Sequence, residues 1–399
     1  MVTSEEHYFS PISGGIYSSG PATYSSWSRY LEAFDELVVV ARVRHSHGPE
    51  NDHQRADGPG VFFRALPDHT GPWQYLQLRR QAKFIARSAI AECTSYLLRT
   101  PGLVSQLLWS EIVRLKKPYA IEVLGDPWES LGPKTWASPL RPVFRVFATQ
   151  QLKRICTGAV AASYVTAETL QKRYPPSKSA YAVGFSDVNL DNAIVPAETV
   201  KGRHRRLHEL PWRGSKSTNP IRIGFIGSLA QMYKGPDILL HATALCSGRL
   251  NFQLILVGAG RYLPEIKTLA AKLGIADLVE FRGQLSSDSI FEVLDSIDLF
   301  VMPSRAEGLP RALVEAMSRG CPCISSDVGG IPELLEATDL VPPNSPERLA
   351  KLILQVAADP DRLLAMSARN LAKAAQFSPQ ALNECRRAFL EEVERRSRL

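Results

Sequence analysis

The sequence predicts an α/β fold with two domains. Short apolar runs of strand length alternate with longer segments of helical periodicity along the 399 residues. A chain of this length is expected to form two domains, each with its own core. Periodicity is lost over residues 186–219. We therefore expect a first domain over residues 1–190, a basic linker over residues 191–219, a second domain over residues 220–375 and a final helix over residues 376–399.

The composition is that of a soluble globular protein. Hydrophobic residues make up 45% of the chain and charged residues 22%. No apolar run approaches the roughly 20 residues that a membrane-spanning helix needs, and the acidic, polar N-terminus lacks the pattern of a secretory signal. The six cysteines are scattered through apolar surroundings, which favours reduced structural thiols and a cytoplasmic protein.

The positive charge is concentrated in the first half of the chain. Residues 1–214 contain 26 Lys and Arg against 19 Asp and Glu, whereas residues 215–399 contain 21 of each. A solvated basic surface explains this surplus, and attraction to an anionic membrane surface or a phosphate-bearing acceptor is the alternative. Nucleic acid is not expected, because no aromatic-plus-basic motif accompanies the charge. One predicted helix presents a basic face made of Arg79, Arg80, Lys83 and Arg87.

In the first domain, the first predicted strand is short and polar, and the others are short runs richer in apolar residues, bounded by turn residues or helices. These strands are expected at residues 6–9, 37–43, 61–66, 94–98, 119–124, 159–163 and 180–184. The intervening helices are expected at residues 27–34, 72–90, 100–115, 143–155 and 167–174.

Two features of the first domain were weighed as sites. Gly14 and Gly15 directly follow the first strand, and glycines there permit a ligand to approach the backbone closely, although a plain turn explains them too. His45, His47 and His53 lie in a polar segment rich in Gly, Asp and Pro without acidic or thiolate partners, so we expect no metal site there.

The second domain shows the same alternation. Strands are expected at residues 221–227, 252–257, 278–282, 297–302 and 322–326. Helices are expected at residues 236–245, 290–294 and 310–320, and three more close the chain at residues 346–357, 363–375 and 379–395.

Two carboxylates flank the start of the helix that opens near Pro310. Glu307 lies in the preceding loop, and Glu315 lies about one and a half turns into the helix. This loop follows a buried strand at its carboxyl end, where open parallel sheets bind ligands, and a helix start attracts anions. A diphosphate on the amides with one carboxylate on each side for hydroxyls describes a sugar nucleotide. A solvated loop acid and an exposed helix acid are the alternatives.

Two further loops at strand ends suit the same ligand. Lys234 stands just ahead of a helix that Pro236 begins, where a lysine can pair with phosphate. Gly258 begins a Gly-Ala-Gly sequence at another strand end, which favours the floor of a pocket.

The string Pro-Ser-x-x-Glu-Gly-Leu-Pro-x-x-Leu-x-Glu-Ala-Met-x-x-Gly-x-Pro, followed by Ser-Asp-Val-Gly-Gly-Ile-Pro-Glu, closely resembles the donor-site signature of family 4 retaining glycosyltransferases. The resemblance covers residues 220–375 well and the first half loosely. It implies the GT-B architecture, in which two Rossmann-like domains with parallel sheets face each other across a deep cleft. It also implies that the final helix crosses back onto the first domain.

The resemblance implies roles for the residues of the signature. Glu307 would lie near the hydroxyls of the donor sugar and Glu315 on the ribose, with the amides of Gly308 and Leu309 along the sugar and phosphates. Lys234 would lie on the diphosphate.

The resemblance also assigns the neighbouring loops. Gly227-Ser-Leu-x4-Lys-Gly matches the diphosphate-binding loop, but Ser228 replaces an arginine common among relatives, so one positive charge is missing. Arg305 or the Gly14–Gly15 loop is a candidate to compensate. Backbone groups near Leu285 would hold the nucleobase.

The chain departs from the pattern at the strand end near residue 124. Many family members carry a histidine there, whereas this chain has Leu124 and Gly125, with Asp126 just beyond. Asp126 is a candidate to orient acceptor or sugar hydroxyls, and a turn aspartate before proline is the alternative. Asp359-Pro-Asp361 has the form of the metal motif of the other glycosyltransferase fold, but Asp361 is expected to cap a helix, so no metal is expected.

We therefore expect a retaining, metal-independent glycosyltransferase that uses no cofactor. It would move a sugar from a nucleotide-diphosphate donor, for which UDP is one expected carrier, to a glycan or lipid-linked hydroxyl acceptor. Polysaccharide or glycolipid synthesis at the inner face of the cell membrane is the expected setting. The alternatives are a sugar-nucleotide epimerase or phosphorylase on the same fold, and a non-catalytic sugar-nucleotide-binding protein.

Overall fold

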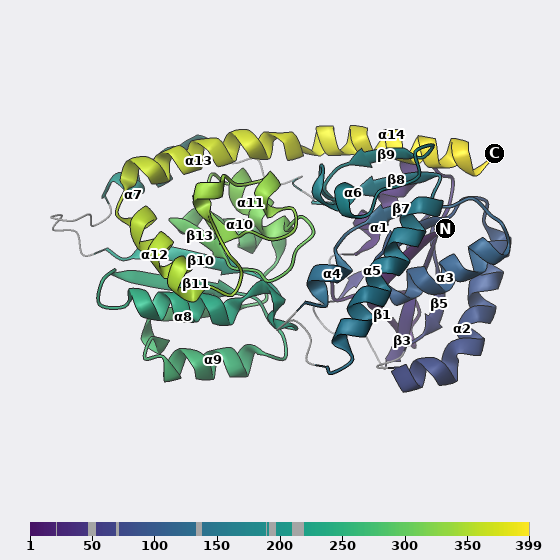
Figure 1. Ribbon diagram of the computed structural model, residues 1–399, viewed down its shortest axis with the longest axis horizontal. Helices are drawn as coiled ribbons and strands as arrows, with labels where there is room; N and C mark the ends of the chain where they lie inside the picture. Colours follow the sequence, from purple (N-terminus) through teal and green to yellow (C-terminus); the bar gives the residue numbers. More distant parts are fainter. Residues whose placement is uncertain are drawn as a thin grey trace. The chain divides into compact units, whose positions relative to one another are not determined.

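The computed structural model describes residues 1–20, 22–46, 53–68, 72–132, 138–188, 190, 197–209 and 219–398. The chain separates into two compact units. The first contains Met1–Gly125, Phe147–Phe185 and Asn383–Leu399, and the second contains Asp126–Val146 and Ser186–Leu382. Each unit is built around its own sheet (Figure 1).

The sheet of the first unit is mainly parallel, in the order β5-β3-β1-β6-β7-β8-β9. Its strands β7 and β8 are fully buried, because parallel sheets are covered on both faces. The strands are β1 (Val2–Pro11), β3 (Leu37–Ser46), β5 (Val61–Pro67), β6 (Leu97–Thr100), β7 (Ala120–Val123), β8 (Ala161–Tyr164) and β9 (Tyr181–Gly184). Two short strands, β2 (Tyr17–Ser18) and β4 (Gln54–Arg55), extend it in antiparallel fashion beyond β1.

Helices connect these strands, and all of them except α4 overlap helices that the sequence pattern predicts. They are α1 (Tyr24–Ser28), α2 (Pro72–Glu92), α3 (Leu103–Arg114), α4 (Pro127–Ser130), α5 (Arg141–Gly158) and α6 (Thr169–Arg173). The C-terminal helix α14 (Pro379–Ser397) also contributes to this core, because Phe389, Leu390 and Val393 are buried in one cluster with Val2 and Val39. The last helix of the chain therefore completes the first unit.

The sheet of the second unit is entirely parallel, in the order β12-β11-β10-β13-β14-β15. Figure 1 shows α8 and α9 on one side of it and α10, α11 and α13 on the other. The strands are β10 (Ile221–Ile226), β11 (Phe252–Val257), β12 (Val279–Gly283), β13 (Leu299–Met302), β14 (Cys323–Ser326) and β15 (Leu340–Val341). The helices are α8 (Pro236–Cys246), α9 (Leu263–Lys272), α10 (Ser287–Ser296), α11 (Arg311–Ser318), α12 (Pro346–Ala357) and α13 (Pro360–Ala374).

The strand order reverses direction between β10 and β13. From β10 the chain adds β11 and β12 on one side, and then returns to place β13, β14 and β15 on the other. Ligands of open α/β sheets bind at the carboxyl ends of the strands beside such a switch point. The loops that follow β10 and β13 are therefore the place to look for a site.

The stretch expected to be a basic linker contains a helix. Helix α7 (Ala197–Glu209) belongs to the second unit, and its Arg203 is fully buried while Arg206 pairs with Asp298 at 3.1 Å. These two arginines are therefore not part of a basic surface patch. A smaller correction concerns α13, which Asp359 caps by accepting a hydrogen bond from the Arg362 amide at 2.9 Å, in place of the expected Asp361.

Candidate functional site

The loops after β10 and β13 lie against each other. A glycine is required at position 235, because its φ is +72° and a Cβ there would lie 2.1 Å from the carbonyl oxygen of Pro303. The amide of Arg305 donates to the carbonyl of Tyr233 at 2.6 Å. The two loops that the sequence singled out, with Lys234 in one and Glu307 in the other, are thus joined through their backbones.

Lys234 and Glu307 form an ion pair at the centre of this region. The Lys234 Nζ lies 2.8 Å from Glu307 Oε1, and the hydroxyl of Ser304 donates to the same oxygen at 2.7 Å. Both charged side chains are largely buried. Burial alone would lower the pKa of Lys234, but the Glu307 carboxylate raises it above its usual range, so the lysine stays protonated. We call these three residues the Lys234–Glu307 cluster.

Glu315 lies beside this cluster, on helix α11. Burial raises the pKa of its carboxyl, and the positive charges of Arg311 and Lys234 partly offset that shift. The pattern of two glutamates separated by seven residues therefore does bring both carboxylates to the neighbourhood of one lysine. This arrangement offers two acceptors for hydroxyl groups and a cation whose charge acts on both.

Arg305 holds the two loops together. Its guanidinium donates to both carboxylate oxygens of Asp237 at 2.8 and 2.6 Å, to the carbonyl of Met232 at 2.6 Å, and to the Asn344 side chain at 2.7 Å. Four of the five N–H groups of Arg305 are thus donated to these partners, and the expectation that Arg305 compensates for the arginine missing at position 228 stays a prediction.

The remaining loops predicted to bind the donor lie at the same strand ends. Gly227 and Gly258 follow β10 and β11, and a Cβ on Gly258 would lie 1.9 Å from the Gly227 carbonyl oxygen, so the backbones touch. Ser228 is exposed, and its hydroxyl accepts from the amide of Ala230 at 3.2 Å. Leu285 follows β12 and is half-buried. Their contacts with a nucleotide stay predictions.

Gly308 and Leu309 complete the loop between β13 and α11. The carbonyl of Gly308 accepts from the amide of Gly330 at 2.7 Å, and Leu309 is buried. The second glycine-rich segment of the signature, which contains Gly329 and Gly330, is therefore joined to this loop by a backbone hydrogen bond.

Three sequence predictions fall outside this group. Gly14 and Gly15 follow β1 in the first unit, both with positive φ, and their part in donor binding stays a prediction. Asp126 is buried and caps helix α4, where its carboxylate accepts from the Trp128 amide at 2.8 Å. This is the turn role weighed as the alternative, and a role in orienting hydroxyls stays a prediction.

Of the histidine segment, the structure describes His45 and His53. His53 stacks on Phe9 with ring centroids 4.4 Å apart, and His47 lies outside the described residues. No group of three or more His, Cys, Asp or Glu side chains within the described ranges is arranged to hold a metal.

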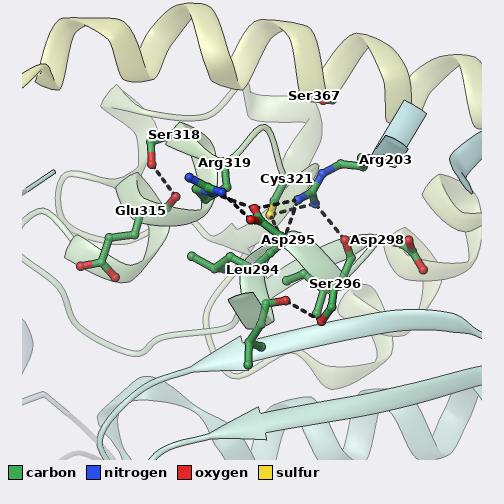
Figure 2. A network of polar contacts seen from close by, with 12 residues as sticks. Arg203, Leu294, Asp295, Ser296, Asp298, Glu315, Ser318, Arg319, Cys321 and Ser367 are labelled. Atoms are coloured by element: carbon green, nitrogen blue, oxygen red, sulfur yellow. Dashed lines mark hydrogen bonds and ion pairs between the residues drawn. The ribbon is translucent and has the colours of Figure 1, made fainter. Parts of the chain in front are cut away.

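A buried polar network supports the far end of α11 (Figure 2). Arg319 and Arg203 approach Asp295 from opposite sides, with Arg319 Nε 2.7 Å from Asp295 Oδ1 and Arg203 Nη2 4.0 Å from the same carboxylate. Arg203 also donates to the Cys321 sulfur at 3.0 Å. The Glu315 side chain points away from this network, so α11 is anchored at its C-terminal end, one turn beyond the glutamate.

Ser304 and Asp237 are functional neighbours that the sequence reasoning missed. Ser304 belongs to the Pro-Ser pair that opens the recognised string, and that is the signal that could have identified it. Asp237 gave no signal, because an acid in the first turn of a helix is common for reasons of helix stability alone.

Comparisons with known proteins identify relatives of the chain. A family model for glycosyl transferases group 1 matches residues 208–376. The chain is 25% identical over 341 residues to protein CapJ of Staphylococcus aureus, covering 84% of this chain and 81% of that protein. It is 30% identical to a D-inositol 3-phosphate glycosyltransferase of Streptomyces scabiei, but that match covers 59% of this chain and only 54% of the relative, about half its length.

Solved structures show the same fold over the whole chain. The structure of Alr3699/HepE from Anabaena in complex with UDP-glucose superposes with a TM-score of 0.64 at 17% identity, covering 100% of both chains. Within the described residues, no helix has both the length and the apolar character that a membrane span requires. Residues 208–376 are therefore similar to the glycosyl transferases of group 1, and the chain has the GT-B fold.

Proposed function

We propose that the protein is a retaining, metal-independent glycosyltransferase of family 4 that transfers a sugar from a nucleotide-diphosphate donor to a hydroxyl acceptor. The observation that carries this proposal is the Lys234–Glu307 cluster with Glu315 beside it, at the switch point of a parallel sheet. The match of the surrounding residues to glycosyl transferases group 1 supports it.

Each residue of the site has a proposed part. Lys234 uses one ammonium hydrogen on Glu307, which leaves two donors for the donor diphosphate. The α11 amides add the positive end of a helix dipole. Glu307 accepts from hydroxyls of the transferred sugar, and Glu315 accepts from the ribose. Stabilisation of the departing nucleotide diphosphate is then the main contribution to catalysis, as the anomeric carbon passes through an oxocarbenium-like state.

The donor is proposed to carry UDP, and the acceptor to be a glycan or a lipid-linked glycan. The UDP-glucose complex of a protein with the same fold supports the first proposal, and the relatedness to an inositol phosphate glycosyltransferase supports a hydroxylated acceptor. We place the reaction in the cytoplasm, at the inner face of the membrane.

Proton NMR of the purified protein with a panel of nucleotide sugars tests this function. We expect nucleotide diphosphate to be released from one donor, more rapidly with acceptor, and the transferred or hydrolysed sugar to keep the anomeric configuration of the donor. The rate should be unchanged by EDTA. An inverted anomer would contradict the retaining mechanism, and a loss of rate with EDTA would contradict metal independence. The absence of turnover with every donor would contradict the proposal that the protein is an enzyme.

A further inference from the structure

The charge balance around Lys234 leaves the proposed diphosphate site short of positive charge. Each phosphate of a nucleotide sugar is negatively charged at neutral pH, yet Lys234 is already paired with Glu307 at 2.8 Å. Glu315 adds a second acid next to that pair. Without another cation, the cluster would carry net negative charge and would repel the diphosphate.

Two positions that could supply this cation are less suited to it. Position 228 holds a serine, which has no charge. Arg305 is 7% exposed, and both of its terminal nitrogens contact Asp237. Its charge is therefore paired within the loops, and four of its five N–H groups are donated there.

Arg311 is placed differently. It is the first residue of α11, its side chain is exposed, and it forms no hydrogen bond or ion pair with any residue that the structure describes. Glu315 lies one helical turn further along the same helix, so the two side chains share a face. The positive charge of Arg311 acts on both Lys234 and Glu315. It makes the pKa of each group lower than the other surroundings alone would make it.

We propose that Arg311 is the second cation of the donor site and binds the diphosphate together with Lys234. This inference rests on the proposed function and deepens it. A guanidinium presents a planar pair of N–H donors that matches two phosphate oxygens, whereas the Lys234 ammonium acts as a point charge. Because Arg311 has no ion pair with any described residue, none of these pairs has to break before it binds the ligand. Its charge also favours the ionised form of Glu315, which accepts from the ribose.

The test is calorimetric titration of UDP and uridine, with GDP and guanosine in parallel, into wild-type protein and the Arg311→Gln variant. We expect Arg311→Gln to weaken binding of the nucleoside diphosphate by about tenfold or more, since a charge-assisted contact is lost. Binding of the nucleoside should be nearly unchanged at a pH well above the titration of Glu315. Arg311→Lys should retain part of the affinity.

Two further variants sharpen the result. Ser228→Arg in the Arg311→Gln background should recover affinity for the diphosphate, because it returns a positive charge to the adjacent loop. Arg348→Gln is the matched control, since Arg348 is also an exposed arginine in the first turn of a helix of the same unit, α12. It should change neither affinity.

The outcomes separate the two claims. If the wild-type protein binds UDP or GDP and Arg311→Gln binds it equally well, the role of Arg311 is wrong while the proposed function stands. An equal loss for nucleoside and nucleoside diphosphate would also overturn it, because that pattern indicates a disturbed fold and not a phosphate contact. If the wild-type protein binds no nucleoside diphosphate, the proposed function fails and this inference fails with it.

Discussion

The two glutamates of the site have different surroundings, and these predict different losses on substitution. Glu307 accepts from Lys234 and Ser304, next to the proposed transferred sugar, so Glu307→Gln should reduce turnover by about a hundredfold. Glu315→Gln should mainly weaken nucleotide binding, by about 1–3 kcal/mol for a lost charge-assisted hydrogen bond. Steady-state kinetics and titration of the nucleotide measure the two effects separately.

Glu347→Gln serves as the control for both variants, because Glu347 is an exposed acid in the first turn of α12. Wild-type rates and affinities in both Glu307→Gln and Glu315→Gln would show that the donor site lies elsewhere.

The raised pKa of Glu315 predicts a cost in stability that depends on pH. An acid whose pKa is higher in the folded state than in the unfolded state contributes stability below its ordinary pKa, and that contribution is lost as the pH rises through the raised value. Glu315→Gln removes this titration. The variant should therefore melt at a higher temperature than the wild type at neutral pH, and the difference should shrink towards about pH 4. The same difference at both pH values would contradict the raised pKa of Glu315.

Residues of the site could be predicted from the sequence only where they are part of a recognisable motif. Glu307, Glu315 and Lys234 stand at fixed spacings around strand ends, and the structure brings them together. The partner of Arg305 could not be predicted, because a long flexible side chain can reach either a ligand or a neighbouring acid, and only the packing of the two loops selects Asp237.

At the scale of the elements, a buried arginine contributes to holding helix α7 on the second unit, beside the ion pair of Arg206 with Asp298. Arg203 is fully buried and donates to the carbonyls of Leu294 and Ile297 at 2.7 and 2.8 Å. Arg203→Met would remove these two hydrogen bonds, and Asp295 would lose a nearby positive charge. We expect a loss of about 2–4 kcal/mol in the free energy of unfolding, measured by urea denaturation.

Arg205 provides the matched control, because it lies on the same helix and is exposed. Arg205→Met should leave the urea midpoint nearly unchanged. If Arg203→Met and Arg205→Met unfold at the same urea concentration, α7 is not anchored in the way that Figure 2 shows.

The strands could be predicted more fully than α7. Apolar runs such as residues 252–257 are buried on both faces, so hydrophobicity alone marks them, and the structure has a strand over the same six residues. Helix α7 is rich in Lys, Arg and His, and its interior contact depends on a guanidinium that finds backbone carbonyls. Such a helix has no periodic pattern of apolar residues in its sequence, so the sequence predicts a linker there.

At the scale of the whole molecule, the structure reduces the number of basic residues on α2 that are available for the expected membrane contact. Two of the four basic residues predicted on α2 lie against Glu111 of α3, with Arg87 at 2.8 Å and Lys83 at 3.6 Å. Arg79 and Arg80 are exposed and have no ion-pair partner among the described residues, and Phe84 on the next turn is 74% exposed. We therefore expect these three side chains to contact an anionic lipid surface.

Co-sedimentation with liposomes measures this contact. The protein should pellet with vesicles that contain anionic lipid, less so at high salt, because exposed charges are screened over about 8–10 Å at physiological ionic strength. Arg79→Glu combined with Arg80→Glu should weaken binding, since each basic residue contributes on the order of 1 kcal/mol. If binding does not depend on the charge of the lipid, or if the double variant binds as well as the wild type, α2 does not contact the membrane through these residues.

The central claim is that the second unit binds a nucleotide diphosphate through Lys234, and one calorimetric comparison tests it most directly. UDP and uridine, and in parallel GDP and guanosine, are titrated into wild-type protein and the Lys234→Ala variant, with thermal unfolding confirming that the variant is folded. We expect the wild type to bind one nucleoside diphosphate far more tightly than the corresponding nucleoside. We expect Lys234→Ala to lose most of this difference in affinity and to keep its affinity for the nucleoside. Equal loss for both ligands would place Lys234 away from the phosphates, and no preference for the diphosphate in the wild type would contradict the claim itself.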